Sequence, residues 1–177
     1  MQLEDNNALA HTALGRIRGL LGDEDIGIAE CKTAVDLNPN LAVAHHELGF
    51  ALYYSGQFAE AVLCFEKAIR LSPNDPSRWN FYYMKGCSLN LMGEYEEAIV
   101  SLKDAIRLRP AAFWPYAQVA SSLAGLGRME EARAAIQETL ARKPDCTVAF
   151  VSETSKRLPR DDRNRFLEHL QEAGLPD

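Results

Sequence analysis

A short pattern that ends in proline recurs four times along the 177-residue chain. Its copies are Leu37-Asn38-Pro39, Leu71-Ser72-Pro73, Leu108-Arg109-Pro110 and Arg142-Lys143-Pro144. The prolines are therefore 34, 37 and 34 residues apart. A period of this length is typical of helix–turn–helix units stacked in a row, because one such unit cannot bury its apolar face alone. The sequence thus predicts an all-α solenoid rather than a single globular core.

Glycines recur at fixed positions ahead of each proline. Gly49 and Gly86 fall in the middle of a predicted helix, where glycine costs about 1 kcal/mol relative to alanine. We interpret them as sites where the partner helix approaches closely. Gly56, Gly93 and Gly127 stand at the ends of the first helices, where the left-handed backbone conformation favours glycine. Each helix should contain about 14 residues, or roughly 21 Å.

Three extra residues separate the second repeat from the third. Within this insertion, Asp75 followed by Pro76 is typical of a helix N-terminus. We therefore expect the first helix of the third repeat to begin about one turn early.

Two more helices are predicted after the last repeat, over residues 147–156 and 161–173, with Pro159 between them. The side chains of Phe166, Leu167 and Leu170 recur at helical spacing, so the last helix should fold back onto the fourth repeat. Because the linker after Lys156 is short, we expect this tail to cap the end of the solenoid rather than fill its concave face.

Aligned on the prolines, the chain resembles the tetratricopeptide repeat (TPR) family over roughly residues 8–144. The match rests on positions that recur jointly, such as Leu48-Gly49, Gly56, Phe58, Ala61, Phe65 and Ala68 ahead of Pro73. The resemblance implies a right-handed α-solenoid of about four helix–turn–helix repeats with C-terminal capping helices. It implies a single TPR domain over residues 1–177, with repeats at about 8–41, 42–75, 79–112 and 113–146 and a cap at 147–177.

Three further stretches narrow the resemblance: residues 71–79, the sequence Phe113-Trp114-Pro115-Tyr116-Ala117, and the ending from Phe166 to Asp177. Together they look similar to the C-terminal TPR region of bacterial class III adenylate or guanylate cyclases and of some winged-helix regulators. This implies a regulatory or scaffolding segment. The paired metal-binding aspartates of a cyclase are absent from the sequence, so the chain is expected to be a fragment or a free-standing relative that makes no cyclic nucleotide.

The charge and cysteine content narrow the class of function. A formal charge of -6 and a pI near 5.3 argue against nucleic acid as a partner, since a duplex binder needs a basic face. No apolar run approaches the ~20 residues of a membrane span, so no membrane contact is expected. The four cysteines form no CxxC pair, which favours free thiols and a cytoplasmic location.

No group of residues points to catalysis. His45 and His46 are adjacent, so on a helix they point about 100° apart and cannot share a metal. Cys31 and Cys64 fall in or beside apolar positions and are interpreted as buried filler. Neither a nucleophile–base pair nor a glycine-rich phosphate loop is present. We therefore expect no enzyme activity, no metal and no cofactor.

In the TPR family, fixed positions of the first helices line a concave groove. Carried onto this chain, these positions give a candidate binding groove for a protein or peptide partner: His46, Phe50, Tyr53, Tyr54, Tyr83, Met84, Cys87, Asn90, Trp114 and Gln118. Aromatic clusters of this kind are enriched at binding hot spots. A second interpretation stays open, in which some of these rings are core or are covered by the tail.

A protein-interaction scaffold is thus the favoured function. The alternatives are a regulatory segment of a class III nucleotidyl cyclase or winged-helix transcription regulator, and a small-molecule sensor, which should contain a closed polar pocket. No feature of the sequence specifies the partner or an oligomeric state.

Overall fold

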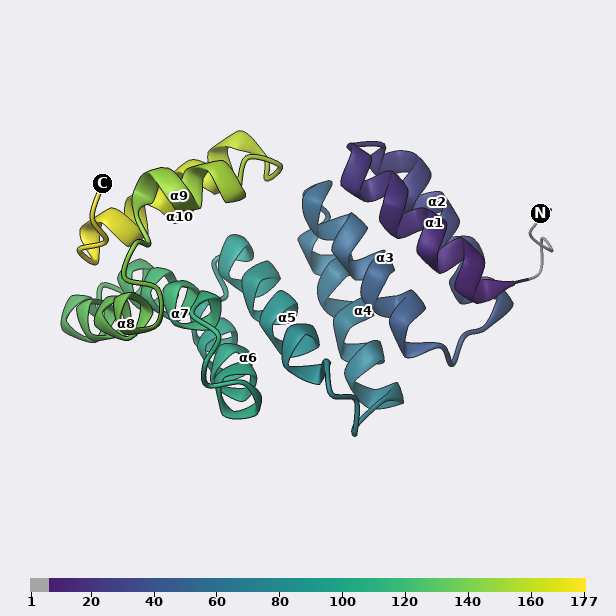
Figure 1. The fold of residues 1–177 in the computed structure, drawn as a ribbon, viewed down its shortest axis with the longest axis horizontal. Coiled ribbons are helices and arrows are strands. Elements are labelled where there is room, and N and C mark those ends of the chain that lie inside the picture. The colour runs from purple at the N-terminus through teal and green to yellow at the C-terminus, as the bar shows by residue number, and fades with distance from the viewer. Residues whose placement is uncertain (1–6) are drawn as a thin grey trace.

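The computed structural model describes residues 7–177, in which every regular element is an α-helix. The helices form a curved row of antiparallel pairs followed by a two-helix tail (Figure 1). This confirms the predicted all-α solenoid. The helices are α1 (Ala8–Leu21), α2 (Glu24–Leu37), α3 (Ala42–Tyr54), α4 (Phe58–Leu71), α5 (Arg78–Met92), α6 (Tyr95–Leu108), α7 (Trp114–Gly125), α8 (Met129–Arg142), α9 (Val148–Thr154) and α10 (Arg160–Glu172).

The helices lie in two layers. Within each pair the first helix packs on the second, and the second packs on the first helix of the next pair. The first helices α1, α3, α5 and α7 also contact one another in that order, so they form the inner layer. The second helices α2, α4, α6 and α8 form the outer layer. The inner layer is therefore the surface on which a concave binding site can form.

In the four pairs, the helices end where the sequence predicts. The second helices end two residues before the recurring prolines, because proline cannot continue a helix. After the first helices, Gly22, Gly56, Gly93 and Gly127 have positive φ angles of 86°, 79°, 84° and 73°. The values at Gly56, Gly93 and Gly127 confirm the predicted left-handed turns, and Gly22 has the same conformation.

Two mid-helix glycines allow the helices of a pair to approach closely. A Cβ atom on Gly86 would lie 2.6 Å from Cγ of Leu102, and one on Gly49 would lie 2.8 Å from Cε1 of Phe65. Both large side chains are fully buried. The second helix therefore places a large, fully buried apolar side chain directly against the backbone of the first, which explains the glycine at this position.

The predicted early start of the third repeat is wrong. Helix α5 begins at Arg78, after an N-cap at Ser77. The Asp75 side chain accepts a hydrogen bond from the backbone N–H of Ser77 at 2.7 Å, and the Asp75 carbonyl accepts one from the N–H of Arg78 at 3.0 Å. Asp75 thus closes a separate turn ahead of the helix, as short acidic side chains often do.

The path of the tail also differs from the prediction. Helix α10 packs on α7, as expected for a cap, but the tail continues past the fourth pair. Arg165 donates a hydrogen bond to the carbonyl of Leu91 at the end of α5, and Arg157 donates one to the carbonyl of Gly19 in α1. The turn between α9 and α10 points toward α3 and the α1–α2 end (Figure 1). The short linker after Lys156 was expected to keep the tail off the concave face. Instead, this turn itself reaches across the inner helices.

The close contact at Gly86 yields a stability prediction. Gly86→Ala should lower the free energy of unfolding by about 1–3 kcal/mol, because the new methyl group overlaps Leu102. Gly19→Ala is the matched control, since a Cβ atom there meets no atom within 4 Å. It should leave stability unchanged or raise it by up to about 1 kcal/mol. Urea unfolding followed by circular dichroism measures both, and equal effects would refute the assigned contact.

Candidate functional site

The inner helices α3, α5 and α7 and the tail enclose a cavity of ≈ 420 Å³, which we call the aromatic cavity. Its size falls within the range of ligand-binding pockets. Its walls come from the inner helices of three consecutive pairs and from the tail, including α9, α10 and the segment that joins them. The lining residues are Phe50, Tyr53, Tyr54, Trp79, Asn80, Tyr83, Met84, Trp114, Gln118, Thr154, Ser155, Leu158 and Phe166.

Most of the predicted groove residues lie together in this cavity. Those that line it are Phe50, Tyr53, Tyr54, Tyr83, Met84, Trp114 and Gln118. Helical spacing brings them together: residues four apart on α3 or α5 stand on the same face, and that face belongs to the inner layer. That they bind a partner stays a prediction.

The structure places Cys87 and Asn90 in the core instead of the groove. Their exposed fractions are 1% and 2%. Asn90 donates hydrogen bonds to the hydroxyl of Ser122 at 2.6 Å and to the carbonyl of Gln118 at 3.4 Å. Asn90 therefore faces α7, which contacts α5. Both residues were predicted to line the groove, but packing within the solenoid buries them.

The aromatic walls are built from neighbouring ring contacts. The rings of Phe50 and Tyr54 meet edge to face at 4.9 Å, and those of Trp79 and Tyr83 lie 6.2 Å apart. Such ring pairs are stabilising at these separations and hold each other in fixed orientations. The cavity therefore presents flat apolar surfaces that are already arranged.

One polar group in the wall has no partner. The side chain of Gln118 is 5% exposed, and its Oε1 atom accepts no hydrogen bond from any described residue. Buried polar atoms are nearly always paired in folded proteins. Gln118 thus places one buried, unpaired acceptor atom among the apolar rings of the wall.

Burial keeps the tyrosine side chains of the cavity wall uncharged. It raises the pKa values of Tyr53 and Tyr83 well above those of exposed tyrosines, and it raises the pKa of the Cys87 thiol beside Tyr83 to about 12. The phenols and the thiol therefore stay protonated at physiological pH. Such a thiol is a poor nucleophile, so Cys87 does not point to covalent chemistry.

His46, the remaining predicted residue, lies in a separate polar cleft of ≈ 350 Å³. Its Nδ1 atom is 3.2 Å from Oε1 of Glu47, and its Nε2 atom is 3.1 Å from Nδ2 of Asn80. A neutral ring that donates from Nδ1 and accepts at Nε2 satisfies both contacts. His46 thereby fixes Asn80, which lines both the cleft and the aromatic cavity.

Sequence reasoning missed the contribution of the tail and of Trp79. Trp79 stands four residues before Tyr83, and this spacing on α5 could have placed it in the groove. Leu158, only 7% exposed, and Phe166 close the cavity from the tail side. Phe166 was expected to face the fourth repeat alone. No local pattern marks Leu158, because its position depends on where the α9–α10 turn crosses the inner helices.

Residues 7–177 contain neither a metal-site arrangement nor a membrane-spanning helix. No group of three or more His, Cys, Asp or Glu side chains there has the arrangement of a metal site. None of the helices described is both long and apolar enough to cross a membrane.

Comparisons with known proteins bear on the fold. Two family models, both described as tetratricopeptide repeat, match residues 42–75 and 89–150, together more than half of the chain. No curated protein matches the sequence.

Three solved structures are similar in shape. YrrB, described as a TPR protein with an unusual peptide-binding site, has a TM-score of 0.68 at 22% identity over 95% of this chain and 85% of that chain. MamA from Desulfovibrio magneticus RS-1 has a TM-score of 0.71 at 21% identity, covering 94% and 92%. PilW, described as a type IV pilus biogenesis factor, has a TM-score of 0.75 at 19% identity, covering 94% and 77%. At these identities the likeness concerns the fold.

The raised thiol pKa values predict a loss of stability in alkali. An unfolded cysteine ionises near pH 9, whereas Cys87 in the folded chain does so at about 12. Between these values only the unfolded state releases the proton. The free energy of unfolding should therefore fall by up to about 1.4 kcal/mol per pH unit from this group.

Urea unfolding at pH 8 and pH 10 measures this loss. Cys87→Ala should be less stable than the wild type at pH 8 but should lose less stability between the two pH values. The same loss in both proteins would show that the Cys87 thiol does not carry this pH dependence.

Proposed function

Since the chain belongs to the tetratricopeptide repeat family, we propose that it is a protein-interaction module that holds a segment of a partner protein in the aromatic cavity. Solenoids of this kind use their concave surfaces for binding. The proposed role is non-catalytic. The observation that carries it is the grouping of aromatic side chains from α3, α5 and α7 around one cavity.

The chemistry of the cavity supports an apolar or aromatic side chain as its occupant. The walls consist mainly of aromatic and other apolar side chains, which suit an apolar surface. The small-molecule sensor was expected to have a closed polar pocket, and the aromatic walls do not favour it. The similarity to YrrB, whose description includes a peptide-binding site, supports the choice of a peptide segment.

A single buried side chain does not account for useful affinity. Burying one large apolar side chain contributes about 1.5–3 kcal/mol, whereas a micromolar complex requires about 8 kcal/mol. The partner segment must therefore extend beyond the cavity. The polar cleft with His46 and Arg109 adjoins it through Trp79 and Asn80, and we propose that the segment continues there.

Two finer statements remain proposals. The four cysteines Cys31, Cys64, Cys87 and Cys146 are free, which supports a reducing compartment such as the cytoplasm. The alternative role, as a regulatory segment of a class III nucleotidyl cyclase or a winged-helix regulator, stays a prediction.

Peptide display against the full chain tests the proposed site. The selected segments should carry a large apolar or aromatic residue. Tyr83→Ala should weaken their binding at least tenfold, about 1.4 kcal/mol, because the ring forms part of the cavity wall. Titration calorimetry with the selected peptides measures the change.

Tyr82→Ala is the matched control for Tyr83→Ala. Tyr82 is the preceding residue on α5 but lines a different pocket, beside α6, with Lys85 and Val100. This variant should bind the selected peptides with unchanged affinity. Equal losses in the two variants, or none in either at unchanged stability, would place the interaction outside the aromatic cavity.

A further inference from the structure

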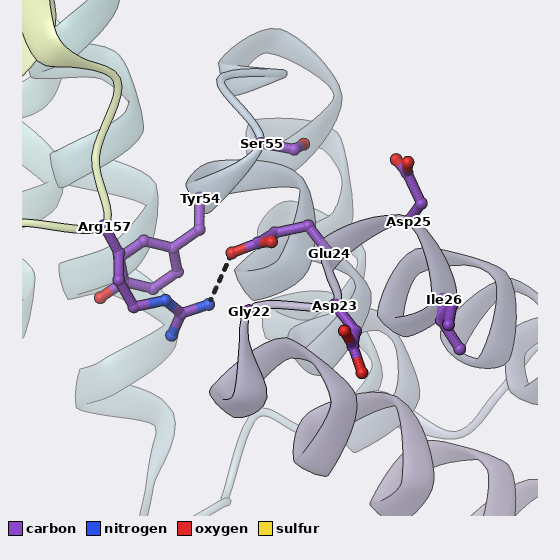
Figure 2. Close-up of a pocket in the computed structure, with 8 residues that line it drawn as sticks. All are labelled: Gly22, Asp23, Glu24, Asp25, Ile26, Tyr54, Ser55 and Arg157. Atoms are coloured by element: carbon purple, nitrogen blue, oxygen red, sulfur yellow. Dashed lines mark hydrogen bonds and ion pairs between the residues drawn. The ribbon is translucent and has the colours of Figure 1, made fainter.

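The segment that joins α9 to α10 inserts an arginine between the first and second helix pairs. The guanidinium carbon of Arg157 lies 4.0 Å from the centre of the Tyr54 ring, a cation–π contact. Its Nη2 atom donates to the carbonyl of Gly19 and lies 3.3 Å from Oε1 of Glu24. Figure 2 shows the guanidinium between the Tyr54 ring and the Glu24 carboxylate.

The cleft that holds this arginine is acidic. It has a volume of ≈ 580 Å³ and is lined by Asp23, Glu24 and Asp25 at the start of α2, while Arg157 is its only basic lining residue (Figure 2). Gly19 also lies in the last turn of α1, where helix carbonyls favour a cation. The three carboxylates outnumber the two cations beside them, which are Arg157 and Arg18, the latter paired with Asp23 at 3.2 Å.

The next two residues of the tail continue along the inner helices. Leu158 is buried in the wall of the aromatic cavity. The Cγ atom of Pro159 lies 3.3 Å from the position of a Cβ atom on Gly56, at the end of α3. The sequence Arg157-Leu158-Pro159 thus contacts the acidic cleft, the aromatic cavity and the turn after α3 in order. Tyr54 borders both the cleft and the cavity.

Side chains alone hold this segment in place. Its backbone hydrogen bonds stay within the tail, for example from the N–H of Leu158 to the carbonyl of Ser155 at 2.9 Å. Among the described residues, no backbone-to-backbone bond joins residues 155–159 to α1, α3 or α5. The Nε atom of Arg157 is buried without a partner. Another segment with the same side chains could therefore replace it.

From these contacts we infer that the tail acts as an internal competitor, and that the partner segment carries a basic residue followed by an apolar residue and a proline. The arginine of the partner enters the acidic cleft, and its apolar residue enters the aromatic cavity. This inference rests on the proposed function and names the chemistry of the partner. Charge complementarity selects a basic segment, and the tail has the advantage of a high effective concentration.

A labelled synthetic peptide with the sequence of residues 152–162 tests the competition. Its affinity for the full-length wild type is compared with that for Arg157→Ala/Leu158→Ala, which empties both sites. The double variant should bind the peptide at least tenfold more tightly. Arg157→Ala alone is the milder variant if the double one does not fold, and it should show a smaller gain in the same direction.

Matched changes in the tail and in the peptide serve as controls. Arg160 is exposed and lines neither site, so Arg160→Ala in the chain should leave the affinity of the wild type unchanged. In the peptide, Arg157→Ala should weaken binding to the double variant at least tenfold, whereas Arg160→Ala should not. Glu24→Gln, added to the double variant, should also weaken binding of the unchanged peptide.

Three results would overturn the inference: no peptide binding to the double variant, equal binding to the double variant and the wild type, or equal binding of the two altered peptides. Display-selected segments that depend on Tyr83 but do not compete with this peptide would overturn the inference and leave the proposed function intact. Absence of any segment that depends on Tyr83 would overturn both.

Discussion

The neighbouring helices of the solenoid do not cover all the apolar surface of the inner helices. The rest of the structure depends on how this uncovered surface is buried. Mid-helix glycines bring α4 and α6 against the outer sides of α3 and α5. On the concave side, no outer helix packs over the rings of Phe50, Tyr54 and Tyr83. Exposed apolar patches are unfavourable in water. The tail reduces this exposure by crossing the inner helices, and the aromatic cavity is the space that it leaves.

The tail also changes what kind of solenoid this is. In a simple repeat array each unit contacts only its neighbours. Here Arg157 contacts residues that are 133 and 138 positions away in sequence, so the tail joins the first helix pair to the last.

The local features of the fold were predictable because they depend on neighbouring residues. The prolines end the second helices, the glycines with positive φ follow the first helices, and helical spacing grouped Phe50, Tyr54, Tyr83 and Trp114 on one face. Burial of Cys87 and Asn90 was not predictable in this way, because spacing gives a face but not which helix covers it. The path of Arg157 depends on charges far away in sequence, and no local pattern carries that information.

The two tryptophans of the chain, Trp79 and Trp114, both line the aromatic cavity, so their indole N–H signals in an NMR spectrum report directly on its occupancy. Adding increasing amounts of a partner segment that binds the chain tests the central claim that this cavity is the binding site. The account predicts that both indole signals shift and saturate together with binding. Binding that leaves both indole signals unchanged would contradict it.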